Sequence, residues 1–548
     1  MNRFCGVSAR GKLRSAAGTR AVPKFVCRFQ GGERRHFLKE NAPRQRASWV
    51  QQLWNRCKRR RPIPRTLCAW LALGFYAALT ALAQQPAPPA PQQPATQQQP
   101  ATQQQPTSTA QQQPGHGAQV HTGTASGLTL DARLQNLLAD HQYARVAAEL
   151  GQLPPGQAQL YRGILANRCN DLETSIQLLE PLLDQVTASG NVAHEKLLRE
   201  ALAQDYLRSG DWAKAAAAYT ALESRLGAQL NPDERDRIEM PLKLLPLAKD
   251  NPPMTVDPCD PFTLQASEDP LGLIDIPVFV DADPKSWMLD PTAPFNLIDR
   301  TTAREVGLKI SDESATIHTL TGRPIQVHMA VIPRFTIGGR LTLRNLTVFV
   351  FDDPDYFFPH SRYQVEGALG YPALAALGSL TVTDEDTIEV RPGKQIDPME
   401  KDDLLKTGTP FYLDGDQIIV ALGQPGGNGS AADPAEEDRM FAVDAGSQQT
   451  YLTSRYFDEH AADFNGLKVD QFSFPGMSGG PQPAYIAETV PLAVGKTTVD
   501  LHYIRVLTQP LGSAALDDVY GVLGIDALGQ LGSYTFDYRT MRFSVRPE

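Results

Sequence analysis

Two stretches of this 548-residue chain share one pattern, and a second matching stretch follows each at the same distance. An apolar run ends in an acid at Asp290 and again at Asp444. A glycine-apolar-apolar-glycine run begins at Gly367 and again at Gly521, 77 residues after the acid in both copies. One shift of 154 residues therefore superposes both landmarks. Self-similarity at so long a period predicts a duplicated unit with two carboxylates at equivalent positions.

Between these landmarks, stretches such as residues 325–329 and 341–350 alternate between apolar and polar side chains, which predicts β-strands. Turn signals at Gly338-Gly339 and at Gly495-Lys496 predict a long hairpin in each copy. We expect two all-β lobes at about 262–395 and 408–548, with a polar segment inserted early in the second. Residues 126–250 have helical spacing instead, so the expected fold class is multidomain α + β.

The amino-terminal 125 residues divide into three further segments. Residues 1–65 carry 18 Lys and Arg against two Glu, and we interpret them as a basic lead-in without a folded role. Residues 66–83 form an uncharged apolar run that ends in Ala81-Leu82-Ala83, the layout of a secretory signal peptide, with an uncleaved membrane anchor as the alternative. Residues 84–125 are rich in Gln and Pro and predict an extended linker. We therefore expect an exported protein of the periplasm, cell envelope or extracellular space, with a possible membrane tether.

The net charge of the chain indicates which kinds of partner it can bind. The net charge of −9, less the +16 of residues 1–65, leaves −25 on the rest of the chain. An acidic body argues against a nucleic-acid-binding surface. Cys169 and Cys259 are the cysteines that would remain after signal cleavage, and they could form a disulfide or stay as two thiols. The cysteines and histidines do not follow the spacing of a zinc site.

The two acid stretches resemble the retropepsin-like and pepsin-like aspartic proteases of bacteria, over most of residues 262–548. In that family each lobe supplies an apolar-apolar-Asp-Thr/Ser-Gly loop and, later, an apolar-apolar-Gly strand beside it. The resemblance implies that Asp290 and Asp444 are the catalytic pair, that a water molecule is the nucleophile, and that no metal or organic cofactor is needed. It also implies that a glycine-tipped hairpin of each lobe contacts the substrate, which would place Thr321, Gly322, Gly476 and Gly479 in the substrate-binding site.

The chain departs from the family pattern beside both acids. The family places Thr or Ser directly after each acid, where its hydroxyl bonds to the other lobe, whereas this chain has Pro291 and Ala445. The following position is the expected glycine at Gly446, but it is Thr292 in the first lobe. The first acid loop is thus further from the family pattern than the second.

The helical region resembles tetratricopeptide repeats. The clearest copy has small and aromatic residues on both sides of a Gly-Asp turn, at Ala203, Tyr206, Gly210, Trp212, Ala215 and Tyr219. Weaker copies lie around Asn170 and around His141-Gln142-Tyr143. The resemblance implies stacked helix pairs that share one core and could dock a protein partner, although a plain helical array without a ligand fits the pattern as well.

Three functions remain open on the sequence. The first is an exported aspartic-type endopeptidase that hydrolyses peptide or protein substrates. The second is a catalytically inactive relative whose lobes bind a peptide or serve as a scaffold, with partner docking by the helical region. The third is a helical-repeat adaptor that carries an accessory β module.

Overall fold

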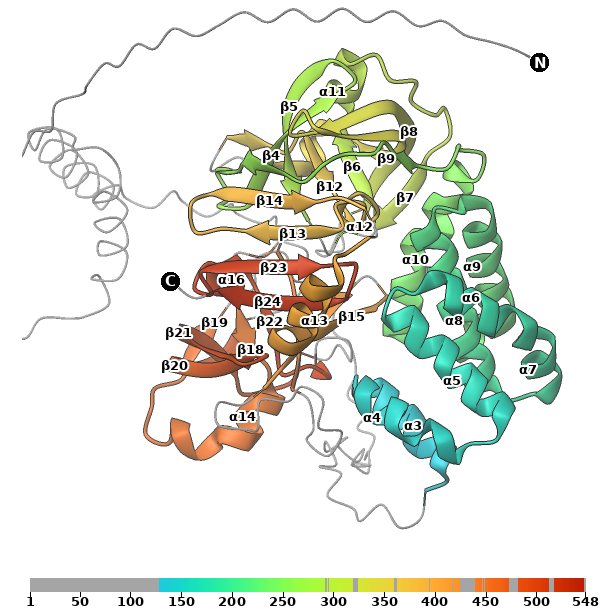
Figure 1. The fold of residues 1–548 in the computed structure, drawn as a ribbon, viewed down its shortest axis with the longest axis vertical. Helices are drawn as coiled ribbons and strands as arrows, with labels where there is room; N and C mark the ends of the chain where they lie inside the picture. The colour runs from blue at the N-terminus through green and yellow to red at the C-terminus, as the bar shows by residue number, and fades with distance from the viewer. Residues whose placement is uncertain are drawn as a thin grey trace, which may run out of the picture. The chain divides into compact units, whose positions relative to one another are not determined.

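The chain is described by a computed structural model over residues 128–546, except for 291–292, 294, 319–323, 359–361, 394, 416, 424–438, 446, 448, 473–480 and 512–516. The expected order of a helical region followed by a strand-rich region is confirmed (Figure 1). The predicted lead-in, signal segment and linker lie outside the described residues. No helix within the described ranges is both long and apolar enough to span a membrane.

The helical region consists of eight α-helices and three short 3-10 turns within the described residues. They are α3 (Leu130–Ala139), α4 (Tyr143–Glu149), η3 (Leu150–Gln152), α5 (Pro155–Arg168), α6 (Leu172–Leu179), η4 (Glu180–Leu182), α7 (Leu183–Ser189), α8 (Val192–Ser209), α9 (Trp212–Leu226), η5 (Gly227–Gln229) and α10 (Pro232–Ala248).

Four helix pairs are joined by the same kind of turn. A residue with positive φ, namely His141 at 56°, Asn170 at 54°, Gly190 at 69° or Gly210 at 75°, directly precedes the N-cap of the next helix. In two of these turns the N-cap is an aspartate, Asp171 or Asp211, whose carboxylate accepts a hydrogen bond from a backbone N–H of the first turn. Such caps satisfy donors that the helix itself leaves unpaired.

A buried carboxylate lies among the helices. Asp205 has no exposed surface and accepts hydrogen bonds from Asn167 Nδ2 at 2.7 Å and from Ser175 Oγ at 2.6 Å. Burial raises the pKa of Asp205 to about 6, even though both hydrogen bonds oppose the shift. These hydrogen bonds connect α5, α6 and α8 in the interior of the helical region.

The strand-rich region has two halves. The first β half comprises β1 (Thr255–Val256), β2 (Phe262–Gln265), β3 (Ser267–Glu268), β4 (Ile274–Val280), β5 (Asp283–Leu289), β6 (Asn296–Asp299), α11 (Arg300–Glu305), β7 (Ala315–His318), β8 (Pro324–Ile337), β9 (Leu341–Phe351), η6 (Asp353–Tyr356), β10 (Phe357–Phe358), β11 (Tyr363–Gln364), β12 (Gly367–Leu369), α12 (Tyr371–Ala375), β13 (Ser379–Val382) and β14 (Thr387–Arg391).

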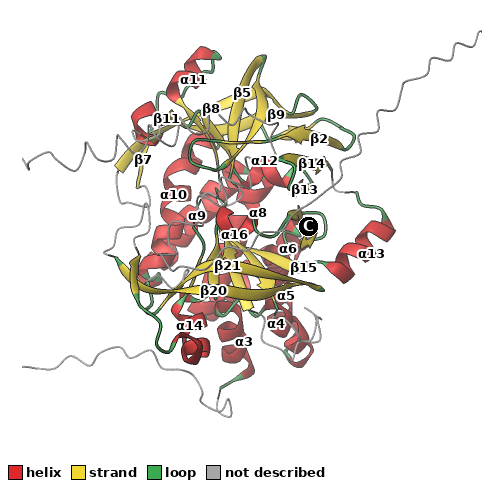
Figure 2. Ribbon diagram, turned by 90° about the vertical axis from the view of Figure 1, so that its left-hand side faces the viewer, coloured by secondary structure: helices red, strands yellow, loops and turns green. Residues whose placement is uncertain are grey.

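Helix α13 (Pro398–Thr407) connects the halves. The second β half comprises β15 (Thr409–Asp414), β16 (Gln417–Leu422), β17 (Arg439–Val443), β18 (Tyr451–Leu452), α14 (Ser454–His460), η7 (Ala461–Phe464), β19 (Asp470–Phe472), β20 (Gln482–Val494), β21 (Thr497–Leu507), β22 (Gly521–Leu523), α16 (Ile525–Leu528), β23 (Ser533–Asp537) and β24 (Arg542–Arg546). Figure 2 shows β20 and β21 side by side as the long hairpin expected from the Gly495-Lys496 turn.

The two halves share one strand pattern. In the first, β12 lies between β5, to which it is parallel, and β6, to which it is antiparallel. In the second, β22 lies between β17 and β18 with the same directions. The register also matches, because Leu369 lies opposite Leu289 in the first half and Leu523 lies opposite Val443 in the second.

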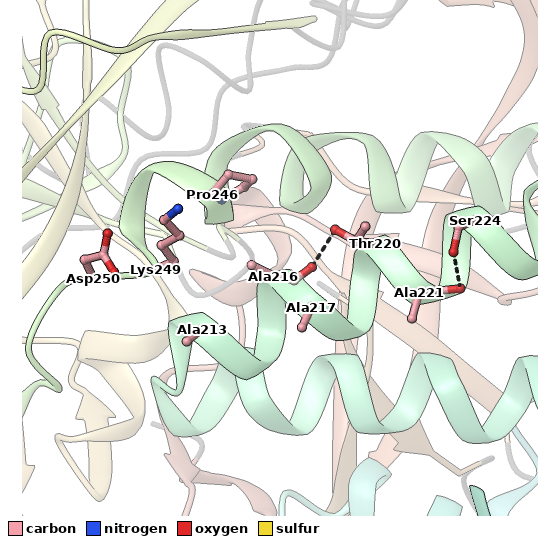
Figure 3. A pocket seen from close by; sticks show the side chains of 9 residues that line it. All are labelled: Ala213, Ala216, Ala217, Thr220, Ala221, Ser224, Pro246, Lys249 and Asp250. Carbon is pink, nitrogen blue, oxygen red and sulfur yellow. Dashed lines mark hydrogen bonds between the residues drawn. The ribbon is translucent and has the colours of Figure 1, made fainter. Parts of the chain in front are cut away.

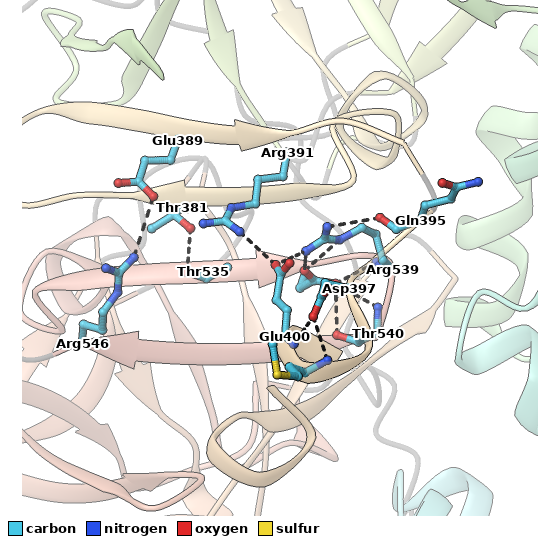
Figure 4. A network of polar contacts seen from close by, with 12 residues as sticks. Thr381, Glu389, Arg391, Gln395, Asp397, Glu400, Thr535, Arg539, Thr540 and Arg546 are labelled. Atoms are coloured by element: carbon cyan, nitrogen blue, oxygen red, sulfur yellow. Dashed lines mark hydrogen bonds and ion pairs between the residues drawn. The ribbon is translucent and has the colours of Figure 1, made fainter. Parts of the chain in front are cut away.

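The halves are joined by antiparallel pairing of β13 with β23 (Figure 1). Thr381 lies opposite Thr535 in this ladder, and their hydroxyl oxygens are 2.8 Å apart. Figure 4 shows a second connection: Glu400 of α13 accepts hydrogen bonds from Arg391 at 3.2 Å and from Arg539 at 2.8 Å. One carboxylate thus links β14 of the first half to the β23–β24 turn of the second.

Cys169 and Cys259 are both free thiols, so the disulfide alternative is not formed here. The inserted polar segment of the second half lies within the 424–438 gap and is outside the described residues.

Candidate active site

Asp290 directly follows β5, a strand that Trp287 and Leu289 hold in the core. Its backbone N–H donates to the carbonyl of Leu369 at 3.0 Å, one step beyond the parallel ladder. Its carbonyl oxygen and its Oδ1 both accept from the backbone N–H of Ala293, at 3.2 and 3.1 Å. The carbonyl of Ala293 in turn accepts from the N–H of Tyr371 at 2.8 Å. The acid loop is therefore fastened to the strand end that carries Gly370.

Asp444 has the corresponding setting after β17. Its backbone N–H donates to the carbonyl of Leu523 at 2.9 Å, and its own carbonyl accepts from Ser447 N–H at 3.1 Å. The carbonyl of Ser447 accepts from Ile525 N–H at 2.9 Å. The donor and acceptor positions here are those of the first half shifted by 154 residues. Both predicted catalytic acids therefore lie at the same point of the same strand arrangement.

Glycine is required beside each acid loop by a close approach of the backbone. A Cβ at Gly370 would lie 2.3 Å from the carbonyl oxygen of Phe295, and one at Gly524 would lie 2.8 Å from the backbone of Gln449. Both glycines have extended, negative φ angles, so space and not backbone conformation excludes a side chain.

Two buried polar side chains hold these glycines, and sequence reasoning missed both. Asn296 Oδ1 accepts from Gly370 N–H at 3.0 Å, and Thr450 Oγ1 accepts from Gly524 N–H at 2.8 Å. Each lies six residues after its acid, but the two are different residue types, so the sequence repeat does not single them out. Their exposed fractions are 3% and 0%.

Asp526 supports Thr450. It is an exposed residue in the first turn of α16, where its Oδ1 accepts from Ala527 N–H at 2.8 Å. The same Oδ1 accepts from the backbone N–H and the hydroxyl of Thr450, at 2.8 and 2.5 Å. Asp526 thus fixes the side chain that holds Gly524. Asp537 is fully buried, and its Oδ1 accepts from Thr540 N–H at 2.9 Å in the β23–β24 turn.

Two ionisable groups close to the acids have raised pKa values. Burial and the nearby charge of Asp444 raise the pKa of the Tyr451 phenol above its usual value, so the phenol stays protonated. In the first half, Asp275 on β4 lies opposite Met288, two residues before Asp290. Burial, with the charge of Asp269, raises the pKa of Asp275 to about 6. Asp275 is a further carboxyl beside the first acid loop that the sequence did not single out.

The structure does not describe the remaining predicted site residues. Thr321, Gly322, Gly476 and Gly479 lie outside the described residues, as do Pro291, Thr292 and Gly446. The strands that flank the two expected hairpin tips are described: β7 pairs with β8 as far as His318 opposite Pro324, and β19 pairs with β20 as far as Phe472 opposite Gln482.

Within the described residues, no three His, Cys, Asp or Glu side chains are grouped closely enough to hold a metal ion.

A cavity of about 560 Å³ lies in the helical region between α9 and the end of α10 (Figure 3). Small α9 side chains such as Ala217 and Thr220 line it, with Lys249 and Asp250 at one end, and neither predicted catalytic acid contributes to its lining. The acid loops therefore remain the best candidate site.

The family model for aspartyl proteases matches residues 276–373, which include Asp290, Asn296 and Gly370. No curated protein matches the chain. Among solved structures, conglutin gamma from lupine seeds is similar over 52% of this chain and 94% of its own, with 11% identity and a TM-score of 0.32. Basic 7S globulin from soybean has the same coverage and TM-score, with 9% identity. A retropepsin-like aspartic protease from Rickettsia conorii is 19% identical over 24% of this chain and 99% of its own, with a TM-score of 0.18.

Proposed function

We propose that this protein is an exported aspartic-type endopeptidase whose two β halves are tandem lobes of a duplicated unit. Asp290 and Asp444 would form the catalytic pair across a pseudo-twofold axis. The supporting observation is the set of backbone hydrogen bonds that recurs at both acids after a shift of 154 residues. Export rests on the apolar run at 66–83.

The pairing of β13 with β23 supports the pseudo-twofold. An antiparallel pair has a local twofold axis between directly opposed residues. Thr381 opposes Thr535, and these two residues are also 154 positions apart. The axis of the ladder therefore exchanges residues that the sequence repeat itself relates, and the same operation would exchange Asp290 with Asp444.

The chemistry follows from two carboxyl groups held close together. Two neighbouring carboxylates cannot both ionise readily, so the pair retains one proton. The ionised member would accept a proton from water as its oxygen attacks the peptide carbonyl. The protonated member would donate its proton to the carbonyl oxygen. Collapse of the tetrahedral intermediate would then break the C–N bond as the amine takes a proton from one carboxyl group. A hydroxyl of the intermediate returns its proton to the other carboxylate as the new C=O forms, so the pair again holds one proton.

A non-catalytic peptide-binding protein is the second candidate. Ala445 follows Asp444 and has a methyl group where the family places a hydroxyl. A pair without this lock could retain peptide binding while losing chemistry, because catalysis needs tighter geometry than binding does. The four similar helix turns support a tetratricopeptide-like region that could dock a protein partner.

The test is cleavage of a denatured protein substrate between pH 4 and 6 by the parent and by Asp290→Asn and Asp444→Asn. Each substitution should abolish cleavage, because either removes the shared proton system. Asp281→Asn is a matched control, since Asp281 is exposed on the β4–β5 turn and its φ of 57° suits asparagine. Unchanged cleavage in either acid variant would reject the proposal. Peptide binding without any cleavage would favour the second candidate.

A further inference from the structure

The face of the sheet that carries Asp290 can be followed across the first β half. Residues opposite one another on neighbouring strands share a face, and alternate residues along a strand point to opposite faces. Asp290 lies two residues after Met288, so both belong to the same face. From Met288 the partners across the sheet are Ala368, Leu297, Phe349 and Met329. We call this set the first acid face.

The second β half has an equivalent face. Ala442 lies two residues before Asp444, and its partners are Val522 and Tyr451 on one side and Ile419 and Tyr412 on the other. We call this set the second acid face. The influence of Asp444 on the phenol of Tyr451 agrees with this assignment, because it requires the two groups to be near each other.

The helical region packs on the second acid face. The ring of Tyr143 on α4 lies 4.6 Å from the ring of Tyr412, and both rings are nearly fully buried. Ile419 and Ala442 belong to the same continuous apolar cluster as the core of the helical region.

A buried ionic contact reinforces this packing at the β15–β16 turn. Asp414 pairs with Arg168 at 3.0 Å and with His141 at 3.3 Å, and it accepts a hydrogen bond from the Tyr143 hydroxyl at 3.1 Å. Burial alone would raise the pKa of Asp414, but Arg168 and His141 outweigh it and hold the pKa well below the usual range. We call these four residues the Asp414 anchor. Their charges are satisfied only while helix and hairpin stay together.

The helical region also packs on the first acid face. Helix α10 contacts β7 and β8, and Asn251, just after α10, donates from Nδ2 to Met329 Sδ and to Thr347 Oγ1, both at 3.1 Å. Phe349 and Leu297 pack in the same apolar cluster as the helical core. One layer of helices thus lies against the acid-bearing face of both halves.

We propose that the helical region is a built-in cover of the two acid faces and that a peptide reaches the acids only after this cover is displaced. The proposal rests on the proposed function for its biological meaning, whereas the cover itself is tested by measuring how readily a reagent reaches the acid faces. The covered area is apolar and the anchor is ionic, so a partner that competes for the helices, or a cut before the first β half combined with loss of the anchor, would release it.

The experiment introduces a recognition sequence for a specific protease between Pro252 and Pro253, both exposed in the connection after α10. Ala442→Cys provides a reporter thiol, because Ala442 lies on the second acid face and is 4% exposed. A bulky maleimide-polyethylene glycol measures access to this thiol, and the modified peptide is quantified by mass. Asp414→Asn weakens the anchor, with Asp500→Asn, an exposed position on β21, as the matched control.

After cutting, the control protein should retain its helical fragment on gel filtration, and the reporter thiol should react slowly. In Asp414→Asn the fragment should separate, and the reporter thiol should react at least tenfold faster. Slow labelling in protein whose fragment has separated would overturn the cover. If Asp414→Asn does not fold by circular dichroism, Asn251→Ala takes its place, and there too a separated fragment with unchanged labelling overturns the proposal.

The same samples distinguish this inference from the proposed function. Fast labelling with cleavage of a denatured substrate supports both. Fast labelling without cleavage supports the cover and counts against the peptidase. Cleavage by uncut parent as fast as by released protein overturns the cover and leaves the peptidase intact.

Discussion

Thr381 and Thr535 form a hydrogen bond across the junction of the two β halves, with their hydroxyl oxygens 2.8 Å apart. The two residues occupy the same place in their respective halves and lie directly opposite each other in the β13–β23 ladder. A residue that pairs with its own equivalent is expected where an axis of internal symmetry passes. The contact thus supports the proposed pseudo-twofold relation between the two halves.

The Thr381–Thr535 bond should appear as coupling in a double-mutant cycle. Thr381→Val and Thr535→Val each remove one hydroxyl and leave the other without its partner, and each should lower the free energy of unfolding by about 1 kcal/mol. The double variant should lose less than the sum of the two, because the second change no longer breaks a bond. Denaturant unfolding of the four proteins measures this, and strict additivity would show that the hydroxyls do not interact.

The close approach at Gly370 and Gly524 predicts that alanine is not tolerated at either position. A methyl group would meet backbone atoms at 2.3 and 2.8 Å, so the acid loop or the glycine strand would have to move. We expect a loss of about 1–3 kcal/mol of stability at each site. Thermal unfolding checks this against Gly151→Ala, where an added Cβ meets nothing within 4 Å. Equal effects at all three glycines would contradict the argument.

Thr450 should be more sensitive than an exposed threonine of the same half. Thr450→Val removes the acceptor of the Gly524 N–H and the donor to Asp526, which leaves a buried N–H unpaired. The expected cost is about 1–3 kcal/mol, compared with about zero for Thr498→Val on β21. If the protein is a peptidase, kcat should also fall more than KM rises, because the loop that holds Asp444 loses its support. A change confined to KM would argue against this positioning role.

The buried carboxyl of Asp205 predicts a pH dependence of stability. Its pKa is raised to about 6 from an ordinary value of 3.8, so between these values the folded protein binds more protons than the unfolded chain. The stability that protonated Asp205 contributes is therefore present below about pH 4 and is lost as the pH rises through 6. Asp205→Asn removes this dependence.

The free energy of unfolding of Asp205→Asn, measured relative to the parent, should rise by about 1–3 kcal/mol as the pH increases from 4 to 7. Denaturant unfolding of both proteins at both pH values, followed by the circular dichroism signal of the helices, measures this difference. Asp211→Asn is the control, because asparagine also caps helices and Asp211 is not fully buried. Parallel pH profiles for parent and Asp205→Asn would rule out the buried carboxyl as the cause.

The parts of this structure that the sequence predicts are those with local causes. Apolar runs predict the strands before Asp290 and Asp444, and glycine at a close approach marks the strands beside them. The partners of those glycines could not be predicted in the same way. Asn296 and Thr450 act on residues 74 positions away and are different residue types, so the repeat hides their equivalence.

The Asp414 anchor was also beyond prediction from sequence. Tyr143 and Asp414 are 271 residues apart, and a hairpin-turn aspartate next to glycine is ordinarily a solvent-exposed turn residue. Its burial depends on the helical region packing against β15, which no local pattern encodes. The same is true of Thr381 and Thr535, whose contact exists only once the two halves have docked.

Ala445 provides the last prediction, which concerns the chemistry itself. The family that the acid loops resemble places a hydroxyl directly after each acid, whereas Ala445 contributes a methyl group and Pro291 has no hydroxyl. If the missing hydroxyls limit the reaction, the combined change of Pro291→Thr, Thr292→Gly and Ala445→Thr should raise kcat on a denatured substrate about tenfold or more, since one positioned hydrogen bond in a catalytic site is worth a factor of that order. Adding Asp290→Asn to the rebuilt protein should abolish the gain. A rebuilt protein slower than an active parent would show that the Pro-Thr loop is a working variant of the site, because the parent loop would then already hold Asp290 in its productive position.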